Sequence, residues 1–181
     1  MEYRLIRSDR RTLAAEIRDG TLIVRAPRQT GEKEIEAFLQ ARRHWIETHL
    51  EQSRERMLMA AETPRLTEAQ VRELAERAAQ VIPQRVARYA ELIGVSYGRI
   101  TIRRQRTKWG SCSSRGNLKF NCLLMLAPPE VLDSVVVHEL CHRLEMNHSD
   151  RFYAHVLRVY PEYRRWNRWL RDNGNRLMAM L

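Results

Sequence analysis

The chain has 181 residues and a formal net charge of +10. This length allows one compact unit with at most a small appendage and excludes two full domains of average size. No apolar run is long enough to span a bilayer and the first residues do not resemble a secretion signal, so we expect a cytoplasmic protein with no membrane segment.

The three cysteines, Cys112, Cys122 and Cys141, have neither the number nor the spacing of a disulfide framework or a paired zinc ribbon. They indicate reduced, mostly buried thiols. Cys141 lies in a histidine-rich stretch, but on a helix it would point away from the histidines. We therefore expect it to be a small hydrophobic residue and not a ligand.

Basic residues gather in two stretches. Residues 99–119 hold seven basic side chains and no acidic one, and residues 151–176 hold seven arginines against two acids. Such stretches are typical of a solvated arginine-rich surface, and they are also typical of a face that binds nucleic acid. Both interpretations stay open, so nucleic acid is one of the partners that the sequence allows.

Residues 1–62 are predicted to form an N-terminal β-hairpin and an amphipathic helix. Residues 3–26 alternate apolar and polar side chains around Asp19-Gly20, which favours a small antiparallel sheet with a tight turn. From about residue 32 to residue 60, apolar residues recur at helical spacing in a stretch otherwise dense in charge, which predicts one amphipathic helix.

Residues 63–181 are predicted to form the metal-binding catalytic domain. Thr67 followed by Gln70 makes a capping box at the start of a second long helix, which Pro83 should kink or divide and Gly94 should end. A second hairpin is predicted over residues 99–128, with a turn at 113–117 and a later strand that becomes wholly apolar and buried at 123–127.

Pro128 and Pro129 suit the first turn of a helix that should extend to about Met146 and be buried on most sides. A basic helical segment over residues 150–169, interrupted at Pro161, should close the fold. The residues after Asn173 are expected to fray.

The stretch VVVHELCHRLEMNHSDRF holds three histidines on or just after the predicted buried helix. Residues four apart share a helix face, so His138 and His142 can offer two imidazoles to one zinc ion. Glu139 lies beside them and can act as general base toward a water on the metal. His148 is the strongest candidate for the third ligand, and His155 is a weaker one.

A His-Glu-x-x-His sequence can also arise by chance on an exposed helix, where its side chains have no function. Here the pattern follows Val135, Val136 and Val137 on an apolar helix. Two histidines and a glutamate would be costly to bury there without a metal or hydrogen-bond partners. The context therefore favours a metal site with three protein ligands and one position left for water, which is typical of catalytic zinc.

The sequence resembles the YgjP-like metallopeptidases, which are similar to SprT-like and Wss1-like proteases in the zincin group. The resemblance covers nearly the whole chain and rests on TKWGSCSSRGNL at 107–118, LAPPEVLDSVVVHELCH at 126–142 and MNHSDRF at 146–152. It implies Zn²⁺ held by His138, His142 and His148, with Glu139 as catalytic base. Glu145 stands where metzincins require glycine, so the chain is not expected to be a metzincin.

We therefore expect an α+β, zincin-like fold and a zinc metallopeptidase that hydrolyses a peptide or protein substrate. Two alternatives remain: a nucleic-acid-associated protease of the SprT-like type, or a binding module in which zinc is structural. The strand that ends near Trp109 and Gly110 could bind a peptide at its edge, or Gly110 could permit a bulge. Tyr153, Tyr160 and Arg151 are candidates for a second electrophile.

Overall fold

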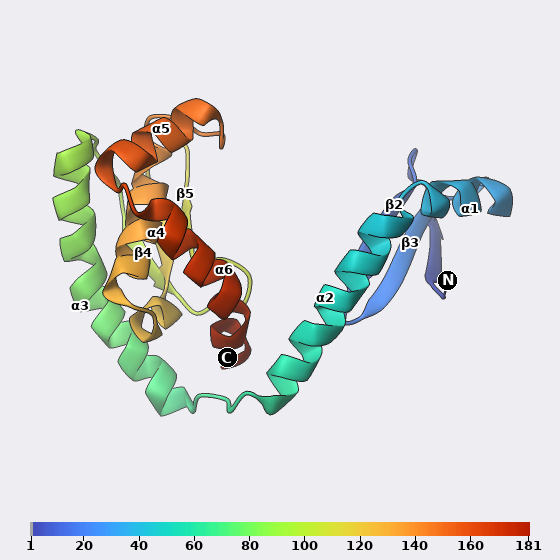
Figure 1. The fold of residues 1–181 in the computed structure, drawn as a ribbon, viewed down its shortest axis with the longest axis horizontal. Helices are drawn as coiled ribbons and strands as arrows, with labels where there is room; N and C mark the ends of the chain where they lie inside the picture. Colours follow the sequence, from blue (N-terminus) through green and yellow to red (C-terminus); the bar gives the residue numbers. More distant parts are fainter. Residues whose placement is uncertain (1) are drawn as a thin grey trace. The chain divides into compact units, whose positions relative to one another are not determined.

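The computed structural model describes residues 2–181, apart from the side chains at positions 56 and 60. Its contacts divide the chain into two units, Met1–Glu62 and Thr63–Leu181. Both units combine a three-stranded sheet with helices (Figure 1). The α+β class expected from the sequence is confirmed.

The N-terminal unit contains a sheet of β1 (Arg4–Ser8), β2 (Ala14–Arg18) and β3 (Thr21–Pro27). β2 and β3 are antiparallel and joined by the predicted turn, where Asp19 and Gly20 both have positive φ. β1 instead pairs in parallel with β3, so the strand order is β1-β3-β2 and the purely antiparallel sheet was wrong. Alternation predicts that residues form strands, but it carries no information on which strands are neighbours.

Two helices pack on this sheet where one was predicted. α1 (Glu32–Gln40) and α2 (Arg43–Glu62) are separated by two residues. The interruption lets Ile35 and Leu39 of α1 and Ile46 of α2 join one buried cluster with β3. Neither glycine nor proline marks this break, so only the packing of the folded unit reveals it.

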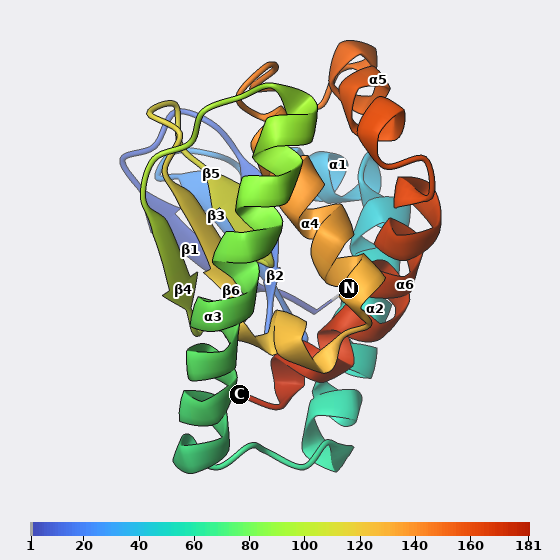
Figure 2. The same cartoon turned by 90° about the vertical axis from the view of Figure 1, so that its left-hand side faces the viewer.

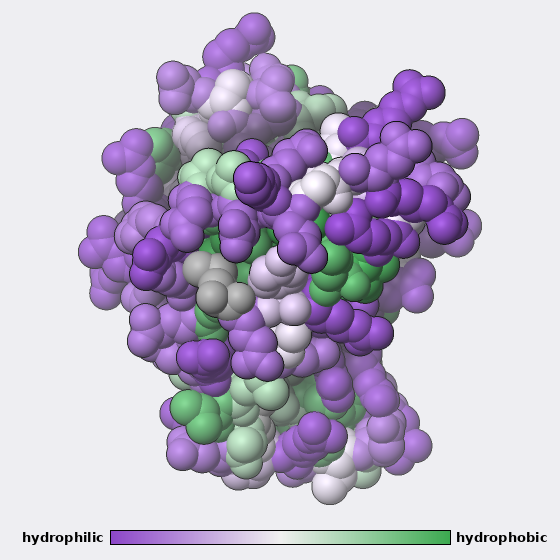
Figure 3. Space-filling view, turned by 90° about the vertical axis from the view of Figure 1, so that its right-hand side faces the viewer, coloured by the Kyte–Doolittle hydropathy of each residue, from purple (hydrophilic) through white to green (hydrophobic). Residues whose placement is uncertain are grey.

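The face drawn in Figure 3 is covered mostly by hydrophilic residues, with apolar residues visible between them. Exposed apolar side chains of the N-terminal unit include Trp45, whose ring stacks on His49 with centroids 4.4 Å apart, and Leu58 near the end of α2. Single exposed apolar residues are normal on protein surfaces and need no ligand to explain them.

In the C-terminal unit, α3 (Glu68–Ile93) begins with the predicted capping box. The Thr67 hydroxyl accepts a hydrogen bond from the Gln70 backbone N–H, and the Gln70 side chain accepts one from the Thr67 N–H. The helix ends at Gly94, whose φ of 81° is the left-handed conformation that glycine adopts without strain. Pro83 lies inside α3, so no new segment begins there.

The second sheet contains β4 (Ile100–Arg103), β5 (Gly110–Cys112) and β6 (Leu118–Asn121), in the order β4-β6-β5. β5 and β6 form the predicted antiparallel hairpin, and β4 pairs with β6 in parallel. The central strand therefore contributes fully buried side chains to the core, among them Leu118 and Phe120.

The apolar run after β6 is not the buried strand that was expected. Residues Cys122–Leu126 form a short 3-10 helix, η1, capped by Asn121, whose side-chain oxygen accepts a hydrogen bond from the Leu123 N–H at 3.1 Å. The Asn121 amide nitrogen donates to the carbonyls of Gln105 and Lys108. A continuous apolar run suits either a buried strand or a buried helical turn, and here the Asn121 cap selects the turn.

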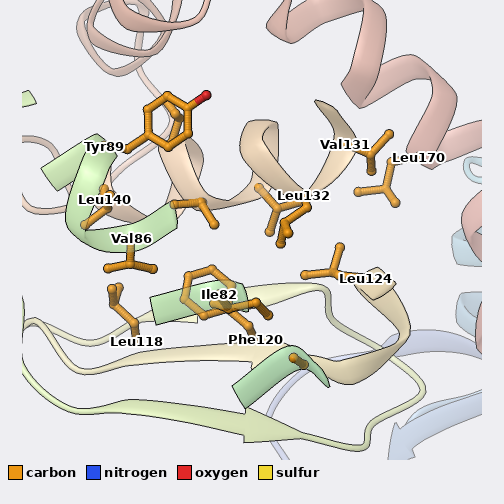
Figure 4. Packing of buried hydrophobic residues seen from close by; sticks show 14 of the residues in the cluster. Ile82, Val86, Tyr89, Leu118, Phe120, Leu124, Val131, Leu132, Leu140 and Leu170 are labelled. Carbon is orange, nitrogen blue, oxygen red and sulfur yellow. The ribbon is translucent and has the colours of Figure 1, made fainter. Parts of the chain in front are cut away.

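α4 (Pro129–Cys141) is the central helix, and it begins at the two prolines as predicted. It packs against α3 on one side and α6 (Tyr163–Ala179) on the other (Figure 2). Figure 4 shows side chains of α3, β6 and α4 meeting in the core, including Val86, Phe120 and Leu132.

Polar contacts fasten α4 at its N-terminal half. The buried Asp133 carboxylate accepts hydrogen bonds from the Arg85 guanidinium at 2.9 Å and from the Tyr89 hydroxyl at 3.1 Å. The Tyr160 hydroxyl donates to the Glu130 carbonyl at 3.0 Å. These bonds tie α4 to α3 and to the end of α5 (Asp150–Val159).

Pro161 separates α5 from α6, as predicted. α6 continues to Ala179, so the expected fraying after Asn173 was wrong. The Met180 carbonyl accepts a hydrogen bond from the Leu66 N–H, which fixes the end of this helix beside the start of α3. Within residues 2–181, no helix is both long and apolar enough to cross a membrane.

Candidate metal centre

His138 lies in the last turn of α4, and His142 is the residue that caps its C-terminal end. The helix ends at Cys141, five residues before the predicted Met146. A hydrogen bond from the Glu145 N–H to the Cys141 carbonyl closes a turn immediately after the helix. This turn changes the direction of the chain and lets the following residues return toward the two histidines.

His148 lies in the segment that returns, two residues before α5 begins. Its Nε2 atom is 3.0 Å from Nε2 of His138. The candidate ligand atoms of His138, His142 and His148 all lie within 4.8 Å of one another. His155 and the buried Cys141 are not members of this group, so the structure gathers the three histidines that the sequence favoured.

The three imidazoles surround the ring of Phe152, which is fully buried. The Phe152 ring stacks on His142 with centroids 4.5 Å apart and meets His138 and His148 edge to face, each at 4.9 Å. An aromatic ring in this position limits the rotation of all three side chains. Phe152 therefore holds the histidines toward a common point without offering a ligand atom.

Hydrogen bonds fix which nitrogens face that point. Nδ1 of His142 lies 3.1 Å from the Glu145 carbonyl, which can only accept, so Nδ1 of His142 carries the proton and Nε2 keeps its lone pair. Nδ1 of His138 lies 2.8 Å from the Tyr163 hydroxyl, so its Nε2 is also the nitrogen turned to the other histidines. Partners of this kind orient ligand imidazoles in metal sites.

The histidines lie where a positive charge on the ring is disfavoured. Burial lowers the pKa of His138 to about 3, and His142 and His148 nearby act in the same direction. Burial also lowers the pKa of His142. Neutral imidazole is the form that binds a metal, so the site keeps its ligands ready at neutral pH.

Glu139 is buried with its carboxylate against the backbone of Gly110 in β5. A Cβ atom at position 110 would lie 2.5 Å from Oε1 of Glu139, closer than real contacts allow. Gly110 therefore makes room for the glutamate, a reason that neither a peptide-binding edge nor a bulge supplied. Burial raises the pKa of Glu139 to about 8, against the charge of Lys108 and a backbone hydrogen bond from Cys112.

A cleft of about 260 Å³ opens beside His138 and Glu139. Its inner wall is largely apolar, and polar groups lie along it from two sides; the lining includes Lys108, Trp109, Val135, Asn167 and Leu170. The Trp109 ring packs on Gly174 of α6, where a Cβ atom would come within 3.1 Å of the ring. Such a cleft suits an apolar side chain of a peptide whose backbone passes the histidines.

None of the three residues considered as a second electrophile lines this cleft. Tyr160 is bonded to Glu130, and Arg151 lies 3.8 Å from the Glu145 carboxylate. The tyrosine that does line the cleft is Tyr163, the first residue of α6. Burial raises its pKa, so its hydroxyl stays protonated.

Sequence reasoning missed both Tyr163 and Phe152. Phe152 could have been found, because it ends the MNHSDRF segment and lies four residues after His148. Tyr163 had no local signal, because it lies 25 residues from His138 and reaches it only through the packing of α6 on α4.

The three nitrogens fit a divalent transition metal. Ligand nitrogens at about 2.0–2.1 Å from a tetrahedral zinc stand about 3.3 Å apart, close to the 3.0 Å between Nε2 of His138 and Nε2 of His148. Imidazole is a ligand that zinc, copper, iron and nickel all accept. The donor set therefore allows a metal centre, with zinc among its natural occupants.

Comparison with protein-family models gives one match: the model described as the YgjP-like metallopeptidase domain matches residues 11–72 and 56–173. No curated protein is significantly similar to the chain.

Two solved structures with similarity to the chain are metallopeptidase zymogens. Abylysin of Pyrococcus abyssi is 18% identical, with 52% of this chain and 96% of that chain covered and a TM-score of 0.47. Jannalysin of Methanocaldococcus jannaschii is 22% identical, with 51% of this chain and 96% of that chain covered and a TM-score of 0.46.

Replacing His148 by Ala should weaken zinc retention severely and leave a folded protein, because the ligand lies in a connecting segment outside the core. The matched control is His155→Ala, which removes a histidine outside the group. Zinc content after dialysis against a mild chelator measures the effect. Full zinc in the first variant together with loss in the second would show that the third ligand is misassigned.

The metal-free protein should lose stability as the pH rises from 6.5 to 8, relative to Glu139→Gln. Folding raises the pKa of Glu139 from 4.5 to about 8, so the folded state holds this proton more tightly and its contribution is lost as pH rises through 8. Starting at pH 6.5 avoids the range over which His138, with its lowered pKa, contributes. Urea unfolding of both proteins with chelator at the two pH values measures the difference, and parallel results would contradict it.

Proposed function

Because the chain belongs to the YgjP-like metallopeptidase family, we propose that it is a zinc-dependent peptidase with His138, His142 and His148 as metal ligands and Glu139 as catalytic base. One observation carries the proposal. Three imidazoles converge on one point, and a buried carboxylate from the same helix as two of them lines the adjoining cleft. This is the donor set and the base that metal-assisted hydrolysis of an amide requires.

Three protein ligands leave one position of a tetrahedral zinc open, which is typical of catalytic sites. A zinc ion bound there would supply a Lewis acid that polarises a carbonyl and makes a water easier to deprotonate. The cleft beside His138 would hold the substrate, with its apolar wall around one side chain. Measurement of the metal content of purified protein tests the identity of the ion.

Glu139 would move the proton. During attack on the peptide carbonyl, its carboxylate accepts one proton from the water, and it returns that proton to the amine nitrogen as the C–N bond breaks. Burial favours the protonated form of Glu139. A divalent cation nearby favours the ionised form, so the two effects together hold the group near the range in which it can both accept and release a proton.

The catalytic function is proposed for the unit Thr63–Leu181. Every residue of the histidine group and every residue that lines the adjoining cleft belongs to this unit. Residues 1–62 would then form an appended unit with its own small core.

The two alternatives make different demands. A nucleic-acid-associated protease requires binding to DNA or RNA that weakens steeply with added salt. A binding module with structural zinc requires a fourth protein ligand. The histidine group among the described residues has three members, which favours the enzyme.

Glu139→Gln should keep zinc and lose activity. Glutamine preserves size but cannot accept the proton, and general-base catalysis supplies a factor of about 10² to 10⁴. Turnover in a peptide-library digest should fall by that factor with zinc content unchanged. A variant that retained both zinc and full activity would exclude Glu139 as the base, and a variant that lost its zinc would identify Glu139 as a ligand.

Gly110→Ala should also lower turnover, although position 110 contacts no candidate ligand in the histidine group. The added methyl would meet Oε1, Cγ and Cδ of Glu139 at 2.5–2.8 Å and displace the carboxylate. The matched control is Gly31→Ala, where nothing lies within 4 Å of the added atom. Zinc content and cleavage rate are measured for both. Equal rates in the two variants would show that the position of the Glu139 carboxylate does not limit the reaction.

A further inference from the structure

Tyr163 stands between the histidine group and the cleft. Its hydroxyl is 2.8 Å from Nδ1 of His138, and its side chain lines the cleft together with Glu139. The residue is 5% exposed and its ring lies nearly parallel to the His138 imidazole, with an interplanar angle of 18°. The hydroxyl therefore meets groups of the protein and whatever enters the cleft, and very little bulk water.

The direction of the hydrogen bond follows from the chemistry of imidazole. A nitrogen that binds a metal carries no proton, and a neutral imidazole carries one. Nε2 of His138 faces His148, so with a metal bound the proton of His138 must lie on Nδ1. Nδ1–H then donates and the Tyr163 oxygen accepts.

The hydroxyl proton of Tyr163 is left over by this arrangement. Among the hydrogen bonds of the described residues, the one to His138 is the bond that Tyr163 Oη makes, and it uses an oxygen lone pair. A buried O–H group without an acceptor is costly. The cleft is the space from which an acceptor can come.

The other hydroxyl on this wall cannot take this role. Ser134 donates its hydroxyl proton to the Val131 carbonyl at 2.7 Å, so that proton is already committed within α4. Asn167 lies one turn after Tyr163 on α6 and also lines the cleft. Tyr163 is the donor on the cleft that is at the same time bonded to a candidate metal ligand.

We infer that Tyr163 forms a hydrogen-bond bridge between the substrate and His138: its oxygen accepts from Nδ1–H of His138, and its proton is donated to a carbonyl oxygen of the substrate. The inference rests on the proposed function, which it deepens by adding a residue that touches the substrate. The accepted bond fixes the orientation of one metal ligand. The donated bond stabilises negative charge that develops on the carbonyl oxygen during hydrolysis.

The bridge makes a prediction for Tyr163→Phe, which removes the hydroxyl and keeps the ring. Loss of a hydrogen-bond partner of a metal ligand typically costs about 10- to 100-fold in affinity, so zinc should transfer to a competing chelator more readily by that factor. The matched control is Tyr153→Phe, because Tyr153 lies beside Tyr163, with ring centroids 6.3 Å apart, and does not line the cleft. Equal zinc affinity in both variants and the parent protein would overturn the positioning role.

The donor role has its own measurement at saturating zinc. Acetohydroxamate is a small zinc ligand that carries a carbonyl oxygen, and calorimetry gives its affinity without any need for a substrate. Tyr163→Phe should weaken it about tenfold, the loss expected for one hydrogen bond of about 1.4 kcal/mol, while Tyr153→Phe should not. Unchanged affinity in Tyr163→Phe would overturn the donor role.

One observation on the parent protein keeps the inference testable if Tyr163→Phe fails to fold. In the zinc-loaded protein, nitrogen-15 NMR should show His138 protonated on Nδ1 and unprotonated on Nε2. Coordination of His138 through Nδ1 would overturn the bridge outright. These readouts do not depend on catalysis, so inactivity of the protein toward peptides would refute the proposed function without removing the evidence for or against the bridge.

Discussion

Two imidazole nitrogens, Nε2 of His138 and Nε2 of His148, lie 3.0 Å apart against the buried ring of Phe152. Two unprotonated nitrogens at this distance repel each other. Protonation offers poor relief, because burial lowers the pKa of His138 to about 3. A cation shared by the lone pairs removes the repulsion, so this contact is the point on which the rest of the unit depends.

The scaffold holds these nitrogens in place from behind. α4 is buried between α3 and α6, and the bonds from Arg85 and Tyr89 to Asp133 fix the helix along its axis. Buried charged groups with all partners present resist displacement, because removing one partner leaves the other uncompensated. His138 therefore comes from a rigid element, while His148 comes from a connecting segment that can adjust as a metal enters.

The local patterns of the sequence predicted the parts of the fold that local chemistry controls. The capping box at Thr67, the left-handed end at Gly94 and the helix start at Pro129 were all confirmed, because each depends on residues within one turn. The same holds for the spacing of His138 and His142, which follows from helix geometry. Parallel pairing of β1 with β3 and the end of α4 at Cys141 depend on partners far away in sequence, so periodicity could not reveal them.

The contact between Gly110 and Glu139 ties two distant positions of the sequence together. The strand can lie this close to α4 only while position 110 lacks a side chain, so the two positions should vary as a pair among related proteins. A relative that carries a larger residue at position 110 should have a shorter residue at position 139, or should have given up hydrolysis and kept the histidines for binding alone. Loss of this glycine is thus a sequence mark by which inactive members could be recognised even when the His-Glu-x-x-His letters are intact.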